Sequence, residues 1–242
     1  MTMRDTRCPL AWRLAAAQSS LGRRWLKFHV HCQCLRAAGF RHAPAVLKRV
    51  SDISISFLLL LILSPLFLLI ALLVKLEDSG SVFFAQTRVG EFGREFRMFK
   101  IRSMCLNAEE RLEQLLGMNH HKEGVTFKIK EDPRITRVGR WLRKYSFDEL
   151  PQLYNVLIGD MSLVGPRPPV PREVSMYSAT HRRRLAIKPG ITCLWQISGR
   201  SEIDFSGQVQ LDVDYIESRN FWMDLGILAR TVPAVLSGKG AC

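Results

Sequence analysis

The feature that most constrains this chain is a run of 22 uncharged residues, ISISFLLLLILSPLFLLIALLV, which lies between Asp52 and Lys75. A straight helix rises about 1.5 Å per residue, so a run of this length can cross a bilayer. Pro65 stands near its middle, where it removes a backbone hydrogen bond and bends a helix, and Ser64 is placed to bond a freed carbonyl. The run is therefore either a transmembrane helix or a helix–break–helix that enters and leaves by the same face.

The charges on the two sides of this run favour the second interpretation. Residues 1–50 carry ten Lys and Arg against one acid, a net charge of +9, while the rest of the chain carries +4. A transmembrane helix would place one basic flank outside, against the positive-inside tendency. We therefore predict a basic, flexible tail over residues 1–47, a re-entrant membrane helix over 48–76, and a cytoplasmic domain at the membrane interface over 77–242.

The tail by itself suits an anionic membrane surface or nucleic acid, and a solvated, disordered tail is an equally good interpretation. It contains HVHCQC, whose His and Cys resemble metal ligands, but no second pair follows at zinc-finger spacing. The six cysteines show no disulfide-framework spacing, which favours reduced thiols on the cytoplasmic side. No aromatic–basic interleaving of a nucleic-acid module is present, so nucleic acid is not an expected partner.

The remaining segments predict an α-rich α+β domain. Residues 81–104 read as a small β-hairpin around the turn at Gly90–Gly93, and residues 107–118 as a helix with a polar face. LPQLYNVLIG is an apolar helix that ends at Gly159. Near the C-terminus, NFWMDLGILARTVPAVL fits an amphipathic interfacial helix or a helix of the core equally well.

The stretch YSFDELPQL sets two carboxylates, Asp148 and Glu149, side by side in the chain. Neighbours on a helix diverge by about 100°, and Ser146 with Glu149 matches a capping box, which favours a structural role. A carboxylate in the first helical turn is also held ionised by the helix dipole, and the basic run before it acts in the same direction. An ionised Asp suits attack on phosphorus or binding of Mg²⁺.

Several basic residues lie in short segments bordered by Gly, Pro or Ser, where a rigid loop can hold a phosphate. Each of them alone is more simply a solvated surface charge, but together they make a diphosphate site plausible. They are Lys100, Arg102, Arg143, Arg167, Lys188 and Arg200. A competing pattern is the D-x-D of Asp212 and Asp214, which would hold a metal on a strand; the surrounding residues look helical, so a structural role is favoured.

Taken together, these motifs resemble those of the bacterial sugar transferases, the monotopic phosphoglycosyl transferases that begin exopolysaccharide and glycan assembly. The resemblance runs from about Lys48 to the C-terminus. It rests on the Ser64–Pro65 break, SVFFAQTRVG, FKIRSM, DPRITRVGRWLRKYSFDELPQLYNVLIGDMSLVGPRPPVPREV, KPGITCLWQISGRS and RTVPAVLSGKGA.

The resemblance implies transfer of hexose 1-phosphate, from UDP-galactose or UDP-glucose, to undecaprenyl phosphate with release of UMP. It implies that Asp148 is the nucleophile of a covalent phosphosugar intermediate and binds Mg²⁺, and that Glu149 deprotonates the acceptor. It places Lys100, Arg143, Arg167 and Arg200 among the phosphate-binding residues. It also implies the cytoplasmic face of the bacterial inner membrane, with membrane lipids as partners and a homo-oligomer left open.

Two positions depart from the family pattern: Cys193 replaces a usual Gly, where a tight turn would be disturbed, and Cys242 replaces a frequent Tyr. The sequence does not indicate which hexose is used. Two other hypotheses stay open at this point. One is a membrane-anchored protein that binds nucleic acid or anionic lipid; the other is a metal-dependent glycosyltransferase that uses the D-x-D and releases UDP.

Overall fold

The structure is a computed structural model that describes residues 45–108, 132–199 and 202–238. By its internal contacts the chain divides into two units, Met1–Lys48 and Arg49–Cys242. The second unit is rich in helices and contains two small sheets, which confirms the α+β class. The cluster HVHCQC and most of the helix predicted over residues 107–118 lie outside the described residues.

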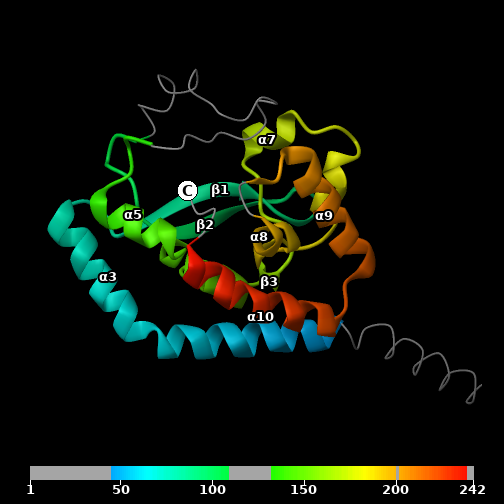
Figure 1. Ribbon diagram of the computed structural model, residues 1–242, viewed down its shortest axis with the longest axis horizontal. Coiled ribbons are helices and arrows are strands. Elements are labelled where there is room, and N and C mark those ends of the chain that lie inside the picture. The colour runs from blue at the N-terminus through cyan, green and yellow to red at the C-terminus, as the bar shows by residue number, and fades with distance from the viewer. Residues whose placement is uncertain (1–44, 109–131, 200–201, 239–242) are drawn as a thin grey trace, which may run out of the picture. The chain divides into compact units, whose positions relative to one another are not determined.

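The long apolar run forms two helices, Ala45–Ile62 and α3 (Ser64–Glu77), separated by a bend of 59° (Figure 1). Pro65 stands in the first turn of α3, and the Ser64 hydroxyl donates to the carbonyl of Leu61 at 2.8 Å. That carbonyl is the one that Pro65 leaves without its helical N–H partner. Within the described ranges, no single helix is long and apolar enough to cross a membrane; the bent pair passes the same test only when both helices are counted together.

The first of these helices is bonded to the rest of the second unit. Arg49 donates to two carbonyls at the end of α6 (Gln152–Ile158), at 2.6 and 2.9 Å. Asp52 accepts from a hydroxyl and a backbone N–H of β3 (Ser162–Val164), at 2.8 and 3.2 Å. These bonds place the bent helices against the elements that follow the two adjacent acids in the chain.

The predicted hairpin is present as β1 (Phe83–Val89) and β2 (Glu95–Ile101), joined through a short 3₁₀ turn, η1 (Glu91–Gly93). The strands pair antiparallel, with Arg88 opposite Phe96 and Phe84 opposite Lys100. Opposite residues share a face of a sheet and alternate residues along a strand do too. Arg88 and Lys100 therefore project from the same face of the hairpin.

The helix predicted to end at Gly159 is α6, and Gly159 adopts a left-handed φ of 96° as its C-terminal cap. Inside α6 the buried side chain of Asn155 bonds the N–H of Phe99 at 3.0 Å and the carbonyl of Arg97 at 2.8 Å, which fastens the helix to β2. The core behind it packs Met98, Val156, Met161, Val164, Tyr215 and Ile227, among others.

The other elements surround this core. β3 pairs in parallel with β4 (Gly190–Thr192). α10 (Phe221–Ser237) has buried Asp224 and Ile227 on one side and exposed Trp222 on the other, so part of this C-terminal helix belongs to the core and part faces outward. The remaining elements are α5 (Arg137–Lys144), η3 (Phe147–Glu149), α7 (Pro171–Ser175), η4 (His181–Ala186), α8 (Leu194–Ser198) and α9 (Phe205–Ser218).

Candidate active site

Charged side chains from five separate segments meet beside the hairpin. The two acids come from η3, and the four basic residues come from β1, β2, the end of α5 and the loop after β3. All six line one cavity of about 1280 Å³, which also has apolar walls from Leu59, Leu63 and α10. The six are Arg88, Lys100, Arg143, Asp148, Glu149 and Arg167.

The two acids lie in a 3₁₀ turn, and the predicted capping box is wrong. Ser146 adopts a left-handed conformation with φ 55° and its side chain caps no helix N–H. Glu149 turns instead toward Lys100 and Arg167, because two cations attract its carboxylate more strongly than a backbone N–H does. The tight turn also lets adjacent acids reach a common partner, which the diverging neighbours of a regular helix would not do.

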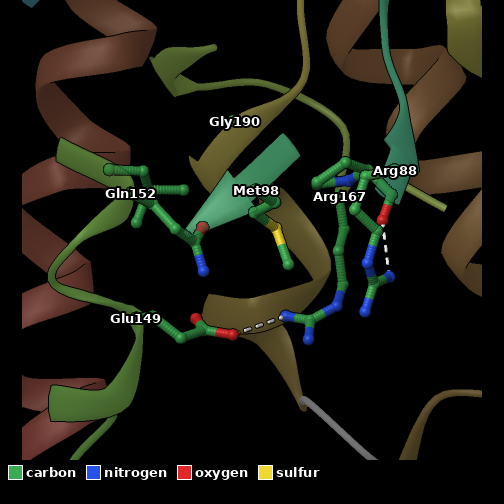
Figure 2. Close-up of a pocket in the computed structure, with 8 residues that line it drawn as sticks. Arg88, Met98, Glu149, Gln152, Arg167 and Gly190 are labelled. Atoms are coloured by element: carbon green, nitrogen blue, oxygen red, sulfur yellow. Dashed lines mark hydrogen bonds and ion pairs between the residues drawn. The ribbon is translucent and has the colours of Figure 1, made fainter. Parts of the chain in front are cut away.

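Glu149 is the best-bound acid of the cluster. Lys100 Nζ lies 2.9 Å from Glu149 Oε1. Arg167 Nη1 lies 3.3 Å from the same oxygen (Figure 2). Burial opposes ionisation of this carboxyl, but Lys100 and Arg167 outweigh it and lower its pKa to about 2. Glu149 is therefore ionised and a weak base for as long as both cations remain on it.

The pKa of Asp148 is shifted the other way, and the direction expected from the sequence is wrong. Its side chain is 8% exposed and lies 4.0 Å from Lys100 Nζ. Burial raises the pKa of Asp148, with Glu149 adding to the rise, while Lys100, Arg143 and Arg167 act against it. The helix dipole does not hold the carboxylate ionised, since α6 begins only at Gln152.

Arg143 reaches the site from the last turn of α5. Its Nε donates to the hydroxyl of Ser103 at 3.0 Å, and burial lowers the pKa of Arg143 while Asp148 opposes that effect. At its other end α5 is capped by Thr136 and by Glu77 of α3, which accepts from two backbone N–H groups at 2.7 and 3.1 Å. The bent helix pair and the active-site arginine are thus joined through α5.

Arg88 is a site residue that the sequence analysis missed. It lies on the same face of the hairpin as Lys100 and beside Arg167. The signal was present in AQTRVG, because a strand that alternates Gln86 and Arg88 places two polar side chains on one face. It was not recognised, since an arginine in a strand is usually a solvated residue.

Other predicted residues stand apart from this cluster. Arg200 lies outside the described residues, and Ser64 and Pro65 are at the bend of the helices. Asp212 and Asp214 lie on α9, where Asp212 is buried against Arg184 and Asp214 is exposed, which agrees with the structural interpretation of the D-x-D. Cys193 has an extended backbone with φ −151°, a conformation open to any residue, so it disturbs no tight turn.

The donor atoms fit Mg²⁺ only in combination with a ligand. Among residues 45–108, 132–199 and 202–238, no group of three or more His, Cys, Asp or Glu is placed to hold a metal ion. Glu149 is already bound by two cations, which leaves Asp148 as the carboxylate with coordinating capacity. Mg²⁺ commonly binds through one or two carboxylates and the phosphates of a substrate, and this arrangement suits the site.

Comparison with known proteins identifies the family. The sequence pattern of the bacterial sugar transferases matches residues 43–238. The chain belongs to the bacterial sugar transferase family. Among its relatives is the galactosyl transferase CpsE of Streptococcus agalactiae, 46% identical over 203 residues, which cover 84% of this chain and 45% of CpsE.

Two further relatives of the sugar transferase differ in length. The exopolysaccharide production protein ExoY of Sinorhizobium fredii is 41% identical, over 83% of this chain and 90% of ExoY. The undecaprenyl-phosphate galactose phosphotransferase of Salmonella typhimurium is 44% identical, over 83% of this chain and 43% of that protein. The chain therefore spans less than half of some curated relatives and nearly all of others.

Proposed function

We propose that this sugar transferase moves hexose 1-phosphate from a UDP-sugar to undecaprenyl phosphate and releases UMP, as a first membrane step of exopolysaccharide or glycan assembly. The observation that carries the proposal is the convergence of Asp148 and Glu149 on Lys100, with Arg143 and Arg167 beside them in one cavity. The names of the relatives, which refer to galactose, undecaprenyl phosphate and exopolysaccharide, support the substrates. Galactose has more support from these names than glucose.

In the first step, a carboxylate oxygen of Asp148 attacks the sugar-bearing phosphorus of the UDP-hexose. The bond from that phosphorus to the bridging oxygen breaks, and UMP leaves with its electron pair. Lys100, Arg143 and Arg167 bind the diphosphate and stabilise the charge that develops on it. A Mg²⁺ held by Asp148 and the diphosphate would supply further neutralisation of that charge.

In the second step, a phosphate oxygen of undecaprenyl phosphate attacks the same phosphorus, and the bond to Asp148 breaks to restore its carboxylate. Glu149 takes the proton of the acceptor phosphate. A carboxylate whose pKa is held near 2 is a poor base, so this role requires a substrate phosphate to draw Lys100 and Arg167 away from Glu149. The ion pairs of Glu149 with Lys100 and Arg167 then explain how the base is activated only when phosphate is bound.

The same proposal places the protein on the cytoplasmic face of the inner membrane, with the bent helices as a re-entrant element. Leu61 and Leu68, on either side of the bend, are 62% and 75% exposed, and lipid would cover them. The basic flanks would then stay on one side. Cysteines introduced as Ser51→Cys and Ser79→Cys, with the native cysteines replaced, should both react with a reagent confined to the cytoplasmic side. Labelling from opposite sides would contradict the re-entrant arrangement.

The decisive assay identifies the nucleotide released from UDP-galactose and UDP-glucose in the presence of undecaprenyl phosphate. UMP is expected, whereas a glycosyltransferase that used the D-x-D would release UDP. Asp148→Asn should lower UMP release by about a thousandfold or more, because the nucleophile is lost. Asp214→Asn, an exposed aspartate outside the cavity, is the matched control and should retain activity. Full turnover by Asp148→Asn would refute the assignment of Asp148 as the nucleophile.

A further inference from the structure

Arg88 is a partly buried guanidinium that is bound only by neutral groups. Its Nε and Nη2 donate to Gln86 Oε1 at 3.1 and 2.7 Å, and its Nη1 donates to the carbonyl of Pro168 at 2.9 Å. Among the described residues, no carboxylate forms an ion pair with it. A cation withdrawn from water without a hydrogen-bonded counter-ion is unfavourable, and the more distant charges of Glu173 and Glu149 do not offset the burial of Arg88, so the position favours binding of an anion.

The positive charge of Arg167, which lies beside Arg88, makes this position still less favourable for a cation. Burial, and then repulsion from Arg167, lower the pKa of Arg88 from 12.5 to about 10. Figure 2 shows both arginines on one side of the pocket, across from Glu149 and Gln152. Four cations in the cluster face only two carboxylates, of which one is bound by two cations at once. The six residues therefore carry surplus positive charge, and Arg88, unlike Arg167, has no ion pair with either acid; Glu173 offsets this surplus only in part.

Arg88 is placed on the Glu149 side of the site, and Arg167 is bonded to Glu149 while also acting on Asp148. Arg88 acts electrostatically on Glu149 and Lys100, whereas the main charges acting on Asp148 are Lys100, Glu149, Arg143 and Arg167. Phosphoryl transfer proceeds in line, so the group that leaves stands opposite the attacking oxygen of Asp148. In a two-step displacement at one phosphorus, the acceptor must then approach from the position that the leaving group vacated.

We propose that Arg88 and Arg167 form a phosphate-monoester subsite that is occupied in turn by the phosphate of the departing UMP and by the phosphate of the incoming polyprenol phosphate. This inference rests on the two-step reaction proposed above. Both occupants carry a terminal phosphate, and a pair of guanidinium groups is well suited to bind one. The subsite explains why Arg88 is kept among neutral partners, since a carboxylate there would compete with both ligands.

The test is a paired measurement on full-length Arg88→Gln in detergent micelles. We determine the inhibition constant of UMP and the KM of undecaprenyl phosphate, with Arg97→Gln as the control from the exposed face of the same hairpin. Loss of a charge-assisted hydrogen bond should raise both constants by about tenfold or more, and by similar factors. Arg97→Gln should leave both constants unchanged.

A purely structural role for Arg88, as a support for the loop at Pro168, would give a different result. It would lower the thermal stability or kcat without a paired shift of the two constants. Arg88→Lys, which retains the charge and one donor for Pro168, keeps the test valid if the Gln variant does not fold; it should show a smaller rise, again matched between the two constants.

Several outcomes would overturn the shared subsite. Unchanged constants in Arg88→Gln and Arg88→Lys would exclude a phosphate contact, and a rise of only one constant would exclude shared occupancy. These failures are distinct from a failure of the proposed reaction, which would appear as full activity in Asp148→Asn. An inactive Asp148→Asn with unaltered Arg88 variants would leave the reaction standing and remove the subsite alone.

Discussion

Two buried clusters of charged residues in this protein differ in their balance of positive and negative charge. In one, Arg184 binds Asp212 Oδ2 through Nε at 2.7 Å and Nη2 at 2.6 Å, with side chains 5% and 1% exposed. Arg184 is also packed over the rings of Phe205 and Tyr177. This pair is balanced in charge and nearly inaccessible to solvent, and we call it the closed pair, although Arg184 also lines the cavity beside Glu149. The cluster around Glu149 has an excess of cations and borders a large cavity.

The comparison shows how burial gives different results for the two carboxyls. Burial raises the pKa of Asp212 to about 6, because the single partner Arg184 opposes it only in part. Glu149 experiences the same effect of burial, yet Lys100 and Arg167 bring its pKa down to about 2. The balanced pair joins η4 to α9, whereas the surplus of cations prepares the other cluster for a phosphate.

The largest expected effect comes from a substitution in the cation-rich cluster around Glu149. Lys100→Met removes the ammonium group that faces both acids and should lower UMP release by about a hundredfold or more, since a donor to the transition state is lost. The assay is UMP release from UDP-galactose. Arg97→Met on the exposed face of β2 serves as the control and should remain active. A Lys100→Met variant with normal turnover would show that the convergence of the acids on Lys100 is incidental.

The second-largest effect comes from a substitution in the closed pair of Arg184 and Asp212. Arg184→Met leaves Asp212 buried without its cation, and removing one member of a buried ion pair typically costs about 3–5 kcal/mol in the free energy of unfolding. Urea denaturation measures this loss. Arg183→Met is the control, because Arg183 pairs with Glu217 at the exposed surface, where ion pairs contribute little. Equal stabilities of the two variants would show that the closed pair does not hold α9.

The smallest expected effect is the pH dependence of the free energy of unfolding, to which Asp212 and Glu149 contribute with opposite signs. Because the folded-state pKa of Asp212 is raised from 3.8 to about 6, its contribution to stability is complete below pH 3.8 and is lost as pH rises through about 6. Glu149 has the opposite sign: its contribution is present above pH 4.5 and is lost as pH falls through about 2. The free energy of unfolding of wild type, relative to Asp212→Asn, should therefore fall by up to about 3 kcal/mol from about pH 4 to pH 7.

Denaturation curves across this pH range test the prediction, with Asp214→Asn as the exposed control. The control should follow the wild type at every pH. A difference between wild type and Asp212→Asn that does not vary with pH would show that Arg184 compensates fully for burial of the carboxyl.

Much of the local structure was predictable from the sequence. Pro65 removes a specific hydrogen bond, so the bend is encoded locally, and Ser64 bonds the carbonyl that Pro65 leaves. Gly159 ends α6 because it alone adopts the left-handed cap at low energy. The hairpin follows from alternation and from its turn. The re-entrant arrangement and the roles of the six site residues remain predictions.

The turn that carries the acids shows where local reasoning fails. Ser146 and Glu149 match a capping box letter by letter, and in an isolated helix they would satisfy each other. In the folded protein, Lys100 lies 49 residues from Glu149 in the chain and Arg167 lies 18 residues away, and both reach its carboxylate. Charges brought in by distant segments outweigh a local hydrogen bond. The same reason accounts for the missed Arg88.

The sequence by itself determined the bend, the hairpin, the family and the identity of the two acids, because each depends on local stereochemistry or on a long, specific motif. Only the tertiary structure decided how the pKa values of those acids are shifted and which residues lie beside Arg88. Both depend on burial and on charges from segments that meet only after folding, and electrostatic energy depends on distance in space and not on distance along the chain.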